Sequence, residues 1–269
     1  MAQDVNHPIG VFDSGVGGLS ILKDIRAQLP YEDLIYVADS AHLPYGTKPA
    51  AYIQERSLMI AKFLVARNVK AIVVACNTAT AAAIRTLRMR YTFPIVGVEP
   101  AVKPATCMTK TGVVGVLATN STLSSDKFSN LIDRFGRSAE IIVQPCPGLV
   151  EQVEKGELST DATRDMLKLY LGNLMSRGVD TIVLGCTHYP FLLPVIESLV
   201  GPEIQILDTG KAVAQELTRR LGADQMLAAR TERGSEEFWT SGITSEVAKR
   251  IVALWGREVT VRALSQIFH

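Results

Sequence analysis

The sequence predicts an α/β protein with two pseudo-symmetric domains, each with a mainly parallel central sheet flanked by helices. Short Val- and Ile-rich runs alternate with segments of helical period, and this alternation restarts near the middle of the chain. One strand-and-turn pattern also occurs twice. Strands that are apolar along their whole length are typical of parallel sheets covered by helices on both faces.

Four strands are expected in the first half of the chain. They are Ile9–Phe12, Leu34–Ala38, Ala71–Ala75 and Ile95–Val98. Helices are expected between them, at Leu19–Gln28, Ala50–Arg67 and Ala79–Arg88. A helix between successive strands is the connection that parallel pairing requires, so these segments read as βαβ units.

The second half repeats this rhythm. Its expected strands are Gly112–Leu117, Glu140–Val143, Thr181–Leu184 and Ile204–Leu207. The chain then ends with the strand-like stretch FWTSG, a helix and a last strand, VTVRAL.

The two halves can be aligned on each other. An offset of 110 places Ile72 on Ile182 and Cys76 on Cys186, and a weaker match at an offset of 105 places IGVFDSG on VGVLATN. Chance similarity between Val-rich strands is the alternative explanation. Because ligands of open parallel sheets lie beyond the carboxyl ends of the strands, both cysteines are expected at a ligand site.

Length and composition restrict the class of protein. The chain has 269 residues, of which 47% are hydrophobic, so it can bury large cores. A formal charge of +1 leaves no basic surplus for nucleic acid as a main partner. The start, MAQDVNHPIG, lacks the pattern of a signal peptide, and the apolar runs are shorter than a membrane span. We therefore expect a cytoplasmic protein with no membrane partner, and reduced thiols.

Cys76 and Cys186 both follow a strand and precede a helix, where the helix amides and dipole favour a thiolate. A free cysteine is more often a small buried hydrophobe. A pair of them allows four uses: a disulfide, a metal site, a hydrolase with one nucleophile, or racemisation. Racemisation needs two opposed groups, because one thiolate removes a proton from a carbon while the other thiol returns one to the opposite face.

Other polar residues lie near the predicted strand ends. Asp13 and Ser14 follow the first strand in FDSGVGGLS, where they would either cap a glycine turn or contact a substrate and relay protons. Tyr45 and Gly46 lie in the loop ADSAHLPYGTK, which would close a site or serve only as a turn.

The second half offers fewer distinctive residues. The hydroxyls of Thr119, Ser121 and Thr122 are expected to cap a helix, where they could also bind a carboxylate. Glu151, in PCPGLVEQ, and His188 are ambiguous, since a lone acid or histidine is usually structural. Cys107 and Cys146 have no repeat partner and are expected to be packing residues.

Several stretches together resemble glutamate racemases, which belong to the cofactor-independent aspartate/glutamate racemase superfamily. They are FDSGVGGLS, YVADSAHLPYGTK, VACNTATA, IVGVEPAVKPA, VLATNSTLSS, LGCTHYPFL and FWTSG. The resemblance implies interconversion of L- and D-glutamate, with D-glutamate supplied for peptidoglycan of the cell wall, and with no pyridoxal phosphate and no metal. It also implies two domains, 1–99 plus 211–269 and 100–210, on either side of a substrate cleft, and a possible homodimer.

The resemblance also implies roles for single residues. Cys76 would act on D-glutamate with support from Asp13, and Cys186 would act on L-glutamate with support from His188 and Glu151. The implied substrate contacts are Asp13, Ser14, Tyr45, Gly46, Asn77, Thr78, Thr122, Thr187 and His188. Thr122 and Glu151 lie in the stretches that match the motifs least distinctively.

Three other functions stay open at this point. Aspartate racemases typically have Cys-Thr-Glu at the second cysteine, whereas this chain has Cys-Thr-His at 186–188. A non-catalytic dicarboxylate-binding protein would need no pair of reactive thiols. A cysteine amidase would need only one of them.

Overall fold

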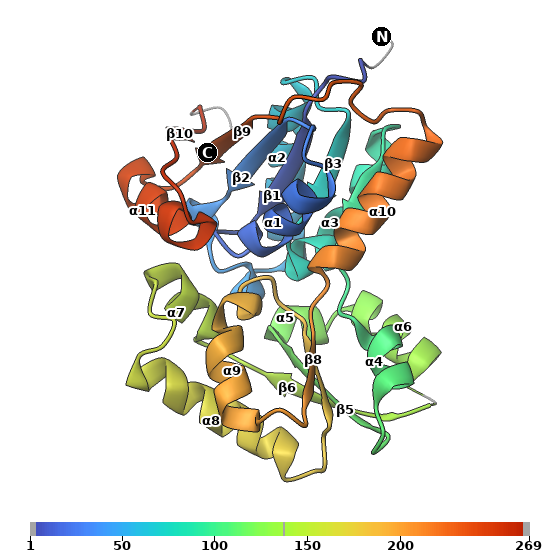
Figure 1. Cartoon of the computed structure of the whole chain (residues 1–269), viewed down its shortest axis with the longest axis vertical. Helices are drawn as coiled ribbons and strands as arrows, with labels where there is room; N and C mark the ends of the chain where they lie inside the picture. The colour runs from blue at the N-terminus through green and yellow to red at the C-terminus, as the bar shows by residue number, and fades with distance from the viewer. Residues whose placement is uncertain (1–3, 137, 266–269) are drawn as a thin grey trace.

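The computed structural model describes residues 4–136 and 138–265, and its strands form two sheets (Figure 1). The strands of the first sheet are β1 (Ile9–Asp13), β2 (Leu34–Ala38), β3 (Ala71–Val74), β4 (Ile95–Gly97), β9 (Glu236–Thr240) and β10 (Val261–Ala263). Those of the second are β5 (Val113–Ala118), β6 (Glu140–Pro145), β7 (Thr181–Leu184) and β8 (Gln205–Leu207). All pairings between these strands are parallel, as the sequence predicts.

The described helices lie between and around the sheets. The α-helices are α1 (Leu19–Gln28), α2 (Ala50–Val65), α3 (Asn77–Arg90), α4 (Val102–Met108), α5 (Asn120–Leu123), α6 (Asp126–Phe135), α7 (Leu149–Lys155), α8 (Asp161–Met175), α9 (Leu193–Val200), α10 (Gly210–Ala223) and α11 (Thr244–Trp255). The 3₁₀ turns are η1 (Ser40–His42), η2 (Tyr45–Thr47) and η3 (Tyr189–Leu192). Helix α2 ends before the predicted Arg67, because the chain turns at Asn68, whose φ is 57°.

The internal repeat of the sequence is a repeat of topology. The order β2-β1-β3-β4 in the first sheet has its equivalent in β6-β5-β7-β8 of the second. The strand pairing agrees with both alignment offsets. Gly10 pairs with Ile72, and their counterparts at offsets of 105 and 110, Gly115 and Ile182, pair in the same way. In the first sheet β2 lies on one side of β1 and β3 on the other, and β6 and β7 flank β5 in the same way. Such a reversal of strand order leaves a crevice at the carboxyl ends of the two strands that flank it.

Alternate residues of each strand pack on opposite faces of the sheet. In β1, Val11 belongs to the core under α1, α10 and α11, while Phe12 belongs to the core under α2 and α3. The first of these cores continues into the second half, where Leu117 and Leu184 pack beneath α7, α8 and α9. Helices α4 and α6 cover the opposite face of the second sheet (Figure 1).

The chain crosses between the sheets twice, after β4 and after β8. These crossings lie close to the predicted domain boundaries at 99/100 and 210/211, and the division into two domains stays a prediction. Residues 1–3, 137 and 266–269 of those predicted domains lie outside the described residues. None of the described helices is both long and apolar enough to cross a membrane.

Candidate active site

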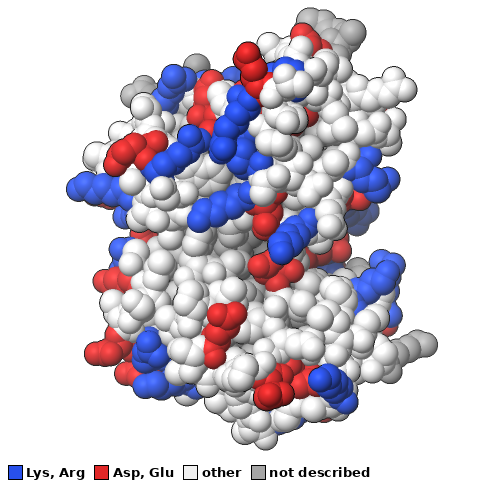
Figure 2. Space-filling view, viewed as in Figure 1, with Lys and Arg blue, Asp and Glu red and all other residues white. Residues whose placement is uncertain are grey.

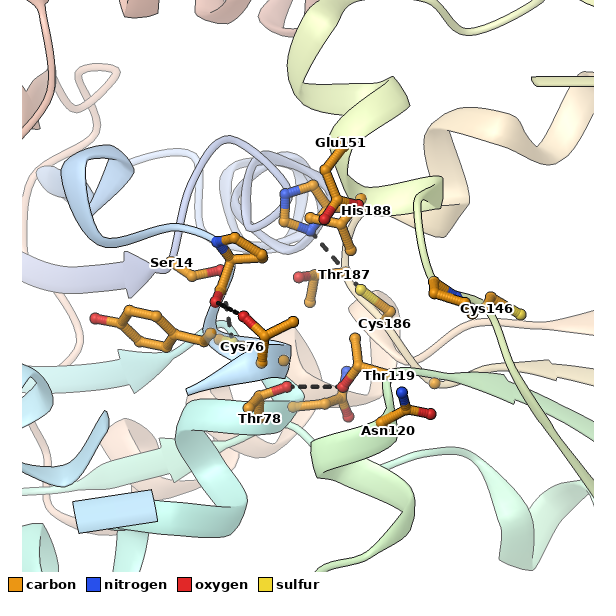
Figure 3. Close-up of a pocket in the computed structure, with 18 of the residues that line it drawn as sticks. Ser14, Cys76, Thr78, Thr119, Asn120, Cys146, Glu151, Cys186, Thr187 and His188 are labelled. Atoms are coloured by element: carbon orange, nitrogen blue, oxygen red, sulfur yellow. Dashed lines mark hydrogen bonds between the residues drawn. The ribbon is translucent and has the colours of Figure 1, made fainter. Parts of the chain in front are cut away.

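One cavity lies between the two sheets, at the carboxyl ends of their strands (Figure 3). It holds about 630 Å³ of space that no atom fills. The predicted site residues that line it are Ser14, Tyr45, Gly46, Cys76, Asn77, Thr78, Glu151, Cys186, Thr187 and His188. Asp13 and Thr122 are buried but do not line the cavity. Both halves of the repeat therefore contribute one cysteine and several polar groups to the same space.

Cys76 is positioned by the junction between β3 and α3. It is the N-cap of α3, and its Sγ accepts a hydrogen bond from the amide of Ala79 at 3.4 Å. This is why the helix begins before the predicted Ala79. The Sγ also lies 4.0 Å from Oγ of Ser14, at the end of the neighbouring strand β1. The helix terminus thus holds the thiol at the cavity wall.

Burial keeps Cys76 in its thiol form. It raises the pKa of Cys76 well above the usual value, and the nearby carboxyl of Asp13 raises it further. The Asp13 carboxyl is itself fully buried, and this burial raises its pKa. Its Oδ2 accepts hydrogen bonds from the amides of Gly15 at 3.2 Å and Gly18 at 3.0 Å. Asp13 is therefore fixed behind the cavity, next to Cys76.

Cys186 lies opposite, after β7 and before η3. Its Sγ is 3.8 Å from Nδ1 of His188, and Figure 3 shows these two groups pointing toward each other. Burial alone would lower the pKa of His188, but its hydrogen bonds with Cys186 and Glu154 outweigh burial and raise that pKa well above the usual value. A protonated imidazole therefore lies beside the sulfur of Cys186.

The carboxylate that holds His188 is Glu154, which sequence reasoning missed. Its Oε1 lies 2.8 Å from Nε2 of His188 and also accepts a hydrogen bond of 2.7 Å from the amide of Val16. Glu151, which was expected to support Cys186 together with His188, lines the cavity. Both acids lie on α7, one turn apart. Glu154 contacts both His188 and the loop after β1, so we assign to Glu154 the support of Cys186 that was expected from Glu151.

The glycines of DSGVGG make room for these groups. A Cβ on Gly15 would lie 1.9 Å from Oε1 of Glu154, and a Cβ on Gly17 would lie 2.2 Å from Nδ1 of His188. Real Cβ atoms do not approach other atoms so closely. The glycine turn is thus the surface against which the second half places its histidine and carboxylate.

Three threonine hydroxyls form a small network between the halves. Oγ1 of Thr78 lies 3.0 Å from that of Thr119 and 3.1 Å from that of Thr122, and the last two are 3.0 Å apart. Each hydroxyl carries only one proton to donate but can accept twice. Thr119 lines the cavity beside Thr78, with Thr122 behind them.

Two other predicted residues differ in how they are held. The hydroxyl of Tyr45 donates a 2.6 Å hydrogen bond to Asp39, which is also paired with Arg56 at 2.7 Å, so this hydroxyl is fixed by its own half of the chain. Asn77 is buried at the cavity wall, and its Oδ1 has no hydrogen-bond partner among the described residues. A donor such as an ammonium group would satisfy that oxygen.

All four cysteines are free. Cys146, expected only to pack, is buried and also lines the cavity. Cys107 is exposed, so the expectation that it packs is wrong: it lies on the outward side of α4, whose buried positions are Val102 and Ala105. Within residues 4–136 and 138–265, no group of three or more His, Cys, Asp or Glu side chains is arranged to hold a metal ion.

Comparison with known proteins agrees with this geometry. The model of the Asp/Glu/Hydantoin racemase family matches residues 9–217, which include both cysteines. The chain belongs to this family. A similar relative is the glutamate racemase of Methylococcus capsulatus, 54% identical over 258 residues, which cover 96% of this chain and 95% of that protein.

Solved structures resemble this chain over nearly its whole length. The crystal structure of a glutamate racemase isoform from Bacillus anthracis has a TM-score of 0.89 at 31% identity, covering 97% of this chain and 99% of that one. The Escherichia coli glutamate racemase in complex with L-glutamate and the activator UDP-MurNAc-ala has a TM-score of 0.84 at 32% identity, covering 96% and 98%.

Proposed function

We propose that this protein is a glutamate racemase, which interconverts L- and D-glutamate by proton transfer at the α-carbon between two thiols. The observation that carries the proposal is the pair of buried free cysteines, Cys76 and Cys186, at equivalent strand ends on one cavity. The 54% identity to a glutamate racemase over 96% of this chain supports the choice of substrate.

The surroundings of the two thiols suit them for opposite tasks. Cys76 is buried beside a carboxyl, so at rest it is a thiol that can give a proton. Cys186 lies beside the imidazole of His188, whose pKa is raised well above its usual value, and we assign to Cys186 the removal of the α-proton of L-glutamate. With L-glutamate between them, Cys186 removes the α-proton and Cys76 protonates the opposite face. The reverse reaction begins from the opposite protonation states.

The carbanion that forms between these steps needs stabilisation, because the α-proton of an amino acid is a very weak acid. Fixed dipoles of the cavity wall would stabilise this charge, and they act more strongly where bound substrate has displaced water. We assign substrate binding, by contact or by support of a contacting group, to Asp13, Ser14, Tyr45, Gly46, Asn77, Thr78, Thr122, Thr187 and His188. Asp13 and Thr122 act from behind the cavity wall, and Thr119 is added to this set since it lines the cavity. No cofactor has a part in this reaction scheme.

The alternatives are weaker. A solved aspartate racemase from Picrophilus torridus is only 16% identical, with a TM-score of 0.51, so that likeness concerns the fold alone. A dicarboxylate-binding protein would have no use for two differently tuned thiols. The expected D-glutamate product would serve peptidoglycan synthesis, and we propose a cytoplasmic enzyme that acts without nucleic acid or membrane, with a homodimer as the expected assembly.

Single-cysteine variants test the proposal. In Cys76→Ala and in Cys186→Ala, one of the two proton-transfer groups is missing, so we expect racemisation of L-glutamate and of D-glutamate to fall to background in both. Circular dichroism follows either direction continuously. Cys146→Ala is the matched control, because it removes a third thiol of the same cavity and should keep turnover within about threefold of the parent. Near-normal turnover in either catalytic variant would refute the two-thiol mechanism.

A further inference from the structure

The carboxylate of Glu154 has one oxygen that the catalytic contacts leave unused. Oε1 contacts both His188 and the amide of Val16, whereas Oε2 is buried and has no hydrogen-bond partner among the described residues. That oxygen forms an ion pair with Arg250, whose guanidinium lies 3.8 Å away. A buried carboxylate needs such compensation, because burial otherwise favours its neutral form.

Arg250 comes from a part of the chain that the sequence motifs do not reach. It lies on α11, in the C-terminal segment, whereas the match to the family model ends at residue 217. Figure 1 shows α11 above α7, which carries Glu154, on the same side of the molecule. The side chain is 31% exposed and also pairs with the exposed Glu246 of its own helix at 3.7 Å. One end of the Arg250 guanidinium therefore faces solvent and Glu246, and the other faces the buried Glu154.

We propose that Arg250 is a positioning residue for the proton transfer at Cys186, an inference that rests on the proposed function. The guanidinium of Arg250 attracts Oε2 of Glu154, so that Oε1 of the same carboxylate stays directed at Nε2 of His188. Glu154 in turn holds the imidazole of His188 at 2.8 Å, and Nδ1 of that imidazole lies 3.8 Å from Sγ of Cys186. A chain of direct contacts thereby links the C-terminal helix to Cys186, whereas the contacts described for Cys76 are with Ser14, with the amide of Ala79 and with the carboxyl of Asp13.

This asymmetry can be measured on isolated thiols. In the Cys76→Ala background only Cys186 can exchange the α-hydrogen of bound glutamate, and in the Cys186→Ala background only Cys76 can. We expect Arg250→Ala to slow α-deuterium incorporation from D2O about tenfold in the first background and less than about twofold in the second. Arg250→Lys should restore most of the loss, because it keeps the charge.

Lys249→Ala is the matched control, because it removes the same charge from an exposed neighbour on α11. It should leave exchange unchanged in both backgrounds. Equal slowing by Arg250→Ala in both backgrounds would indicate general damage to the fold and overturn the proposal. No slowing in either background would overturn it as well.

A second readout separates this inference from the proposed function. Alkylation of Cys186 by iodoacetamide, followed by peptide mass spectrometry, needs no substrate and reports the thiolate. We expect Arg250→Ala to slow alkylation of Cys186 about tenfold and to leave that of Cys76 unchanged. If the protein racemises no glutamate but Arg250→Ala still slows alkylation of Cys186 alone, the proposed function is refuted and the role of Arg250 at Cys186 is retained. An unchanged alkylation rate at Cys186 would overturn that role.

Discussion

Gly17→Ala is a small change that should displace a catalytic group of the opposite half. The added Cβ would lie 2.2 Å from Nδ1, 2.4 Å from Cε1 and 2.6 Å from Cγ of His188. Ordinary contact begins at 3.4 Å, so the imidazole must retreat by roughly 1.2 Å. The same Nδ1 lies 3.8 Å from Sγ of Cys186, so this movement disturbs the contact between the imidazole and the sulfur.

A displacement of about 1 Å in a catalytic group can cost about a hundredfold in rate, which corresponds to roughly 2.7 kcal/mol of activation free energy. We expect kcat of Gly17→Ala to fall by about that factor, measured by circular dichroism with either enantiomer. Gly172→Ala is the control, because a Cβ there meets nothing within 4 Å on helix α8 and should stabilise the protein slightly. Full activity of a folded Gly17→Ala variant would refute the assigned role of His188.

Three further predictions concern carboxylates and cofactors. Glu154→Gln should lower kcat about a hundredfold, because Glu154 holds His188. Glu151→Gln should lower kcat by less than about threefold, and equal effects of the two variants would contradict the assigned role of Glu154. Asp180 is partly buried, which would raise its pKa, but hydrogen bonds from Thr109 and neighbouring amides hold that pKa to about 2. Its stabilisation is present above its unfolded pKa of about 3.9 and is lost as the pH falls through about 2. Asp180→Asn should therefore lower the free energy of unfolding at neutral pH, and the difference from the parent in denaturant titrations should shrink on acidification; a constant difference would contradict this. Since both proton transfers are assigned to thiols, racemisation should survive dialysis against a chelator, and loss that added metal restores would contradict the scheme.

Most of the fold follows from local patterns. The strands are continuous Val- and Ile-rich runs. The two sequence offsets map the pair Gly10 and Ile72 of the first sheet onto the pair Gly115 and Ile182 of the second. Topology then explains the site, because a parallel sheet with this strand order brings the residues after β1 and β3 together. Cys76 and Cys186 could be predicted for that reason.

The choice between Glu151 and Glu154 could not be predicted from spacing. Both lie on α7 within reach of the cavity, and the deciding fact is the contact of α7 with the loop after β1, which is far away in the sequence. Gly15 leaves space there for Oε1 of Glu154. The motif DSGVGG shows that this position has no side chain, but it does not show which distant residue fills the space. Arg250 was missed for the same reason, since it reaches Glu154 from the C-terminal helix.

The central claim is that two different thiols handle the proton on opposite faces of one carbon. The most direct test is to incubate the protein with L-glutamate in D2O and to follow deuterium in each enantiomer by chiral mass spectrometry during the first few per cent of conversion. With two thiols, newly formed D-glutamate should carry α-deuterium while the remaining L-glutamate stays almost unlabelled. D-glutamate that forms with its original hydrogen retained would contradict the account, because a single group would then have carried the proton from one face to the other.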